Sequence, residues 1–146
     1  MEYRIALATT TEGSRRKVFD VLRTTEGQTA FWTTDCELTD VHGRFGFLQA
    51  PIDLDVTISL VEEELVSMTV TSGFPGWNGS TWQWTLTTMP DDDNVTIVQF
   101  RHFGFEPDHE EDAVGFTAQT WAMILDRLAR YIKSGEPDPF FTNEPA

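Results

Sequence analysis

The stretch EDAVGFTAQTWAMILDRLARYIKSG, residues 111–135, decides the fold because it is the one long segment with a helical repeat. Its apolar residues step by four, three, four, three and four positions, namely Val114, Ala118, Trp121, Leu125, Leu128 and Ile132. This spacing places them on one face of a helix of about five turns. Acidic residues at its start and Arg127, Arg130 and Lys133 near its end suit the helix dipole, and Gly135 ends it. The sequence therefore predicts one long amphipathic helix close to the C-terminus.

The sequence before this helix, residues 35–103, repeats every two residues, which is the period of a β-strand. The clearest case is residues 54–60, where Leu, Val, Ile and Leu alternate with Asp, Thr and Ser. The same alternation runs through residues 66–71, 80–89 and 96–102, and turn-forming residues separate the segments. Short connections join antiparallel neighbours, so the pattern predicts about six antiparallel strands.

The N-terminal part of the chain predicts one more strand and two short helices. Residues 3–8 alternate like a strand. Ser14 stands before an amphipathic run that ends at Leu22, so it is expected to cap a first helix. Residues 25–27 (Thr-Glu-Gly) are expected to break that helix, and residues 28–32 to form a second helical turn.

These elements predict an α+β domain of two layers, with an antiparallel sheet of six to seven strands and one long helix to cover it. So long a sheet must curl around the helix, and the curl is expected to leave an internal space. We expect a single domain over residues 1–146, with residues 137–146 as a loose tail.

Composition and charge exclude several classes of partner. The 146 residues carry a net charge of -14, which disfavours nucleic acid and anionic membranes as partners. The chain has no apolar run of membrane-spanning length and no recognisable signal sequence at its start. Cys36 is the lone cysteine, and His42 and His109 have no ligand spacing, so we expect no disulfide, metal or cofactor, and a cytoplasmic location.

Four short stretches resemble one known family. They are residues 25–32 (TEGQTAFW), 43–47 (GRFGF), 76–81 (GWNGST) and 100–105 (FRHFGF). In this order they are similar to the helix-grip superfamily of START, Bet v allergen-like and polyketide cyclase domains (SRPBCC). Within it, the chain most resembles the small domains named for the activator of the ninety-kilodalton heat-shock-protein ATPase. The resemblance implies a deep cavity between sheet and long helix that holds an apolar or amphipathic small molecule.

Aromatic residues on the inward faces are the candidates to line that cavity. Tryptophan carries an N–H that needs a partner when buried, so an ordinary core favours aliphatic residues instead. Several tryptophans on facing elements therefore indicate a wall built for a flat or amphipathic guest. The candidate ligand-binding residues are Trp32, Phe45, Phe47, Trp82, Trp84, Phe100, His102 and Trp121.

Two alternatives to simple binding remain open. His102 lies in phase with Val98 and Phe100, and it would be the base of a cyclase- or aromatase-type enzyme if a second polar residue stood beside it. No catalytic set is evident in the sequence. A co-chaperone-related interaction module would instead need an exposed apolar patch, with Phe74 and Trp77 as candidate members. A homodimer and a chaperone contact are compatible with the resemblance.

Overall fold

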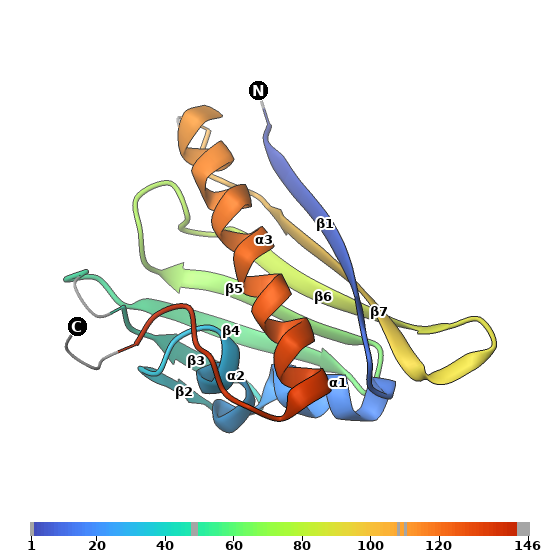
Figure 1. Ribbon diagram of the computed structural model, residues 1–146. Coiled ribbons are helices and arrows are strands. Elements are labelled where there is room, and N and C mark those ends of the chain that lie inside the picture. Colours follow the sequence, from blue (N-terminus) through green and yellow to red (C-terminus); the bar gives the residue numbers. More distant parts are fainter. Residues whose placement is uncertain (1, 48–49, 108, 110, 143–146) are drawn as a thin grey trace.

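The computed structural model describes residues 2–47, 50–107, 109 and 111–142 (Figure 1). The elements follow one another as β1 (Arg4–Thr11), α1 (Arg15–Arg23), α2 (Thr25–Phe31), β2 (Cys36–Leu38), β3 (His42–Phe45), β4 (Leu54–Val61), β5 (Leu65–Ser72), β6 (Thr81–Met89), β7 (Asp92–Phe103) and α3 (Glu111–Ser134). This order confirms the predicted α+β helix-grip fold, with seven strands, two short helices after the first strand and one long C-terminal helix.

The seven strands form one antiparallel sheet in the order β1-β7-β6-β5-β4-β3-β2. The long strand β7 pairs with β1 on one side and with β6 on the other. In the register of β6 with β7, Trp82 is opposite His102 and Trp84 is opposite Phe100. Because paired residues point to the same face, these four side chains lie together on the inward face of the sheet.

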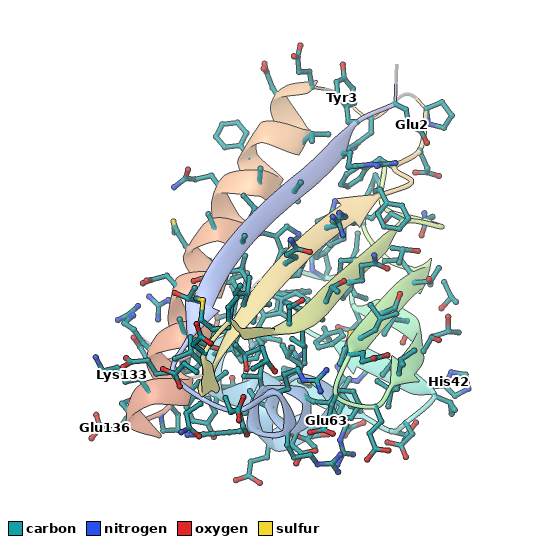
Figure 2. All side chains as sticks on the ribbon, turned by 90° about the vertical axis from the view of Figure 1, so that its right-hand side faces the viewer. Glu2, Tyr3, His42, Glu63, Lys133 and Glu136 are labelled. Atoms are coloured by element: carbon teal, nitrogen blue, oxygen red, sulfur yellow. The ribbon has the colours of Figure 1, made fainter. Side chains whose placement is uncertain are left out.

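The sheet curves around α3, which crosses its concave face (Figure 1). Figure 2 shows the same layering from the side, with α3 on one face only. Most of the predicted apolar stripe of α3 is buried, including Trp121, Leu128 and Ile132, whereas Ala118 is half-buried. Within the described part of the chain, no helix has the length and apolar character needed to cross a membrane.

The two short helices meet at Thr24, and the predicted boundary between them needs a correction. Ser14 caps α1 as expected, by accepting a hydrogen bond from the amide of Lys17. Residues 25–27 were expected to break the first helix, but they form the start of α2, because the hydroxyl of Thr24 accepts from the amide of Gly27 and caps the second helix. Gly27 packs directly on α1, and a Cβ there would overlap the carbonyl oxygen of Val21.

Residues 138–142 are held in place, so the expectation of a loose tail from residue 137 is corrected for this part. The amides of Phe140 and Phe141 donate to the carbonyls of Phe31 and Trp32, at 3.2 and 2.7 Å. From α3, the Arg127 guanidinium contacts both the carbonyl and the carboxylate of Asp138, each at 2.9 Å. Local composition indicated a tail, whereas contacts with distant parts of the chain order this segment. Residues 143–146 lie outside the described residues.

Candidate functional site

An apolar pocket of about 300 Å³ lies beside the first half of α3. Its wall is mainly aromatic, with Trp32, Phe47, Phe74, Trp77, Trp121 and Phe141 as its larger buried or half-buried rings. Phe116, which is 78% exposed, lies at the rim. Among the described residues that line it, none carries a charged side chain. The pocket can therefore accept an apolar, uncharged molecule.

The loop between β5 and β6 positions Trp77. Gly76 has φ +89°, a backbone conformation that glycine adopts without strain. Its amide donates to the carboxylate of Glu106 at 2.6 Å, and the amide of Glu106 donates back to its carbonyl at 2.9 Å. The ring of His109 packs so closely on Gly76 that a Cβ there would overlap it. These contacts tie the loop to the segment that follows β7 and fix Trp77 at the pocket.

Another part of the wall combines residues that are far apart in the chain. The ring of Phe47, which follows β3, lies 5.3 Å from Phe74 and 5.1 Å from Phe141, measured between centroids. Phe141 is held by the hydrogen bond from its amide to Trp32 and by one from the amide of Thr34 to its carbonyl, at 3.1 Å. The C-terminal segment is thus part of the pocket.

Rings of the core fill the space beneath the pocket. Trp121 of α3 is central to them, with centroid distances of 4.6 Å to Phe100, 5.0 Å to Trp32 and 5.6 Å to Trp82. The Trp82 side chain is fully buried, and its indole N–H has no hydrogen-bond partner among the described residues. The expected central hollow is therefore occupied by side chains in its middle, and the open volume lies toward one end.

His102 is fully buried in this core, and both of its ring nitrogens are engaged. The indole N–H of Trp121 donates to Nδ1 at 3.1 Å, and Ser80 Oγ lies 3.0 Å from Nε2. Since an indole nitrogen can only donate, Nδ1 must be the acceptor. The proton of the neutral ring is then on Nε2, which donates to Ser80.

This arrangement is unsuited to general-base catalysis by His102. Burial, together with the nearby positive charge that His109 can carry, lowers the pKa of His102 to about 3. A base that activated Ser80 would need its lone pair on Nε2, but the hydrogen bond from Trp121 places the proton there. His102 also does not line the pocket. The geometry indicates a structural role in which His102 orients the Trp121 ring.

Other reactive side chains are also apart from the pocket. Cys36 is buried, and burial raises the pKa of its thiol to about 12, so the thiol is neutral at physiological pH. His42 lies on β3, exposed at the edge of the molecule (Figure 2). In the described parts of the chain, no three His, Cys, Asp or Glu side chains are grouped so as to hold a metal ion.

Residues 12–133 match the family described as "Activator of Hsp90 ATPase homolog 1-like protein". The chain belongs to this family. No curated protein matches it. The Aha1 dimer from Colwellia psychrerythraea is a similar solved structure, with 25% identity, a TM-score of 0.75, and coverage of 91% of this chain and 98% of that one. The predicted family resemblance is therefore confirmed.

Two more distant structures share the fold. A START superfamily protein from Mycobacterium smegmatis has 9% identity and a TM-score of 0.73, and covers 91% of this chain and 98% of its own. A protein from Mesorhizobium loti has 15% identity and a TM-score of 0.75, and covers 90% and 97%. At these identities the likeness is evidence for the START-like fold alone.

The eight candidate ligand-binding residues fall into two groups, according to whether they line the pocket. Trp32, Phe47 and Trp121 line the pocket. The other five are buried or packed beneath it and do not line it, namely Phe45, Trp82, Trp84, Phe100 and His102. Alternation along a strand identifies inward side chains but does not separate those that meet open volume from those that meet other side chains.

Sequence reasoning missed most of the remaining pocket residues. Phe74 and Trp77 were named only as candidate members of an exposed patch under the co-chaperone alternative, but both are half-buried and line the pocket. Two large aromatics within one turn were the available signal, since a solvated turn seldom uses them. The adjacent aromatics Phe140 and Phe141 gave a similar signal in the presumed tail. Thr117 and Thr120 lie beside the predicted apolar stripe of α3, and nothing in the sequence marked them as pocket residues.

Proposed function

We propose that this protein binds a small, neutral, apolar or amphipathic molecule in the pocket beside α3. The single observation that carries the proposal is an open volume of about 300 Å³ walled by aromatic side chains, with no charged residue among those described in its lining. A wholly structural aromatic core would close such a volume, because voids in a core cost stability. The family and the START-like fold support the proposal.

Thermal unfolding with three neutral probes tests this proposal. Naphthalene, biphenyl and 1-decanol cover flat, jointed and linear shapes. A probe that binds only the folded state raises the melting temperature by mass action. We expect at least one of the three to do so and to change the tryptophan fluorescence, because Trp32, Trp77 and Trp121 line the pocket.

A pair of variants on α3 shows whether the probe occupies this pocket. Thr120 lines the pocket, whereas its exposed neighbour Gln119 does not. Thr120→Trp should block the pocket and abolish the thermal shift, and Gln119→Trp should retain it. The proposal fails if no probe stabilises the wild-type protein, or if the two variants respond alike.

The two alternatives to simple binding are not favoured. The cyclase- or aromatase-type alternative required a polar neighbour for His102 inside the cavity. Ser80 is a polar neighbour of His102, but both side chains are fully buried and neither lines the pocket. The co-chaperone alternative required an exposed apolar patch, and its two candidate members, Phe74 and Trp77, are half-buried and line the pocket instead. A chaperone contact and a cytoplasmic location remain predictions from the sequence.

We also propose that two copies of the chain can associate through the outer face of α3. Phe116 and Met123 are 78% and 42% exposed and lie seven residues apart, so they share one side of the helix. The similar structure from Colwellia is described as a dimer. Native mass spectrometry would give the subunit count, and Met123→Ser should reduce any dimer fraction. A monomer at all protein concentrations would contradict this proposal.

A further inference from the structure

The pocket contains two hydroxyl groups whose hydrogen-bonding state is defined. Thr117 and Thr120 both line it, and their spacing of three residues places them on the same side of α3. The Thr117 hydroxyl donates to the carbonyl of Ala113 at 2.9 Å, and the Thr120 hydroxyl donates to that of Phe116 at 3.0 Å. A hydroxyl has one proton and two lone pairs. With the proton used in the helix, each threonine offers the pocket an acceptor only.

The rest of the lining limits the ligand further. An ionised group would lose its hydration among these aromatic walls without gaining a counter-charge, because none of the described lining side chains is charged. The rings of Trp77 and Trp121 lie only 22° from parallel, with centroids 6.5 Å apart. This separation is less than the roughly 7 Å that two successive carbon–carbon contacts would need, so a guest packs against this aromatic wall and not between the two rings. Aromatic walls favour a flat ring as the guest, because it can stack on them or meet them edge to face.

We propose that the pocket selects neutral, flat ring compounds that carry a hydrogen-bond donor, a phenolic O–H or a ring N–H, which donates to Thr117 or Thr120. This inference rests on the proposed function, since it specifies the ligand class of the same pocket. It also predicts the orientation of the guest, with the donor toward α3 and the ring toward Trp77 and Phe74.

Three matched probes test the donor requirement. 2-Naphthol carries a donor and is neutral at pH 7, 2-methoxynaphthalene has the same ring and oxygen without a donor, and naphthalene has neither. Titration followed by tryptophan fluorescence or calorimetry gives the three dissociation constants. We expect 2-naphthol to bind the wild-type protein roughly three- to tenfold more tightly than 2-methoxynaphthalene, the range that one net hydrogen bond provides.

The Thr117→Val and Thr120→Val double variant assigns this preference to the two hydroxyls. Valine keeps the shape of threonine, and both positions are half-buried on a helix surface, so the fold should be retained. The double variant should lose the preference for 2-naphthol over 2-methoxynaphthalene, a ratio that does not depend on any change in its affinity for naphthalene. Thr29→Val is the matched control, because that hydroxyl also donates to a helix carbonyl, Glu26 at 2.9 Å, but lies outside the pocket.

The outcomes separate this inference from the proposed function. If naphthalene binds but 2-naphthol has no advantage, or if its advantage survives in the double variant, the donor requirement is wrong and binding itself stands. If none of the three probes binds the wild-type protein, the proposed function fails for flat aromatic guests and the donor requirement fails with it.

Discussion

The indole N–H of Trp121, on α3, donates a 3.1 Å hydrogen bond to Nδ1 of His102, on β7. This bond connects the two layers of the fold inside a core made mainly of apolar side chains. Because Trp121 also lines the pocket, the buried histidine fixes the position of a wall residue although its own ring does not line the pocket. Ser80 completes the arrangement by lying 3.0 Å from the opposite nitrogen of the ring.

The first prediction concerns pH. In the folded protein the pKa of His102 is lowered to about 3, whereas an unfolded histidine titrates near 6.5. Below about pH 6.5 the unfolded chain gains a proton that the folded chain does not, so stability falls as the pH drops toward 3. Between pH 7.5 and pH 5 we expect a loss of about 2 kcal/mol from this group.

Urea unfolding at pH 7.5, 6 and 5 measures this loss. His102→Leu removes the titrating ring, and its stability should depend less on pH over the same interval, although it should be lower overall. An identical pH dependence in the wild type and in this variant would contradict the assignment to His102.

The second prediction compares two buried tryptophans. Trp121→Phe removes an N–H that is hydrogen-bonded and leaves His102 Nδ1 buried without a donor, whereas Trp82→Phe removes an N–H that has no partner among the described residues. Both changes replace a buried indole with a smaller phenyl ring, so the volume lost is the same. Trp121→Phe should therefore cost about 1–3 kcal/mol more than Trp82→Phe. Chemical denaturation of the two variants gives the difference, and equal losses would mean that the 3.1 Å bond contributes nothing.

The third prediction concerns two helical glycines. Gly27→Ala puts a methyl group into the carbonyl oxygen of Val21, so α2 must move away from α1 and the protein should lose about 1–3 kcal/mol. Gly115 is exposed on α3 with nothing near its missing Cβ, so Gly115→Ala should stabilise the protein by about 0.5–1 kcal/mol. Melting curves should show a lower melting temperature for Gly27→Ala and a higher one for Gly115→Ala than for the wild-type protein.

The fourth prediction concerns the segment that carries Phe141. The amides of Asp138, Phe140 and Phe141 donate to the backbone of residues 30–32 and should be protected from hydrogen exchange. Arg127→Gln removes the ion pair with Asp138 and should speed their exchange roughly two- to fivefold. Lys133→Gln, on the same helix, breaks only an exposed pair with Glu12 and serves as the control. Equal exchange in the two variants would show that Arg127 does not hold the segment.

The strands and the long helix were predictable because their repeats are local. The alternation in β4, β6 and β7 and the stripe of α3 appear in the structure as the faces that the sequence indicated. The boundary at Thr24 was not predictable in the same way, because it depends on a side-chain cap and on the close approach of α2 to α1. The site was predictable only in part. Trp32, Phe47 and Trp121 line the pocket as expected of inward aromatic residues, but further wall residues come from other positions on α3, from a segment interpreted as a turn and from one interpreted as a tail.

By itself, the sequence determined the α+β class, the layered arrangement of one helix on a curved antiparallel sheet, and a core rich in inward aromatic rings. Periodic patterns suffice for this, since a side chain's direction within a strand or helix follows from backbone geometry alone. The tertiary structure decided where the open volume lies, which hydroxyls face it, and that Trp121 meets His102. These features depend on contacts such as that between Phe141 and Trp32, which are 109 positions apart in the chain (141 minus 32) and meet only once the fold is complete.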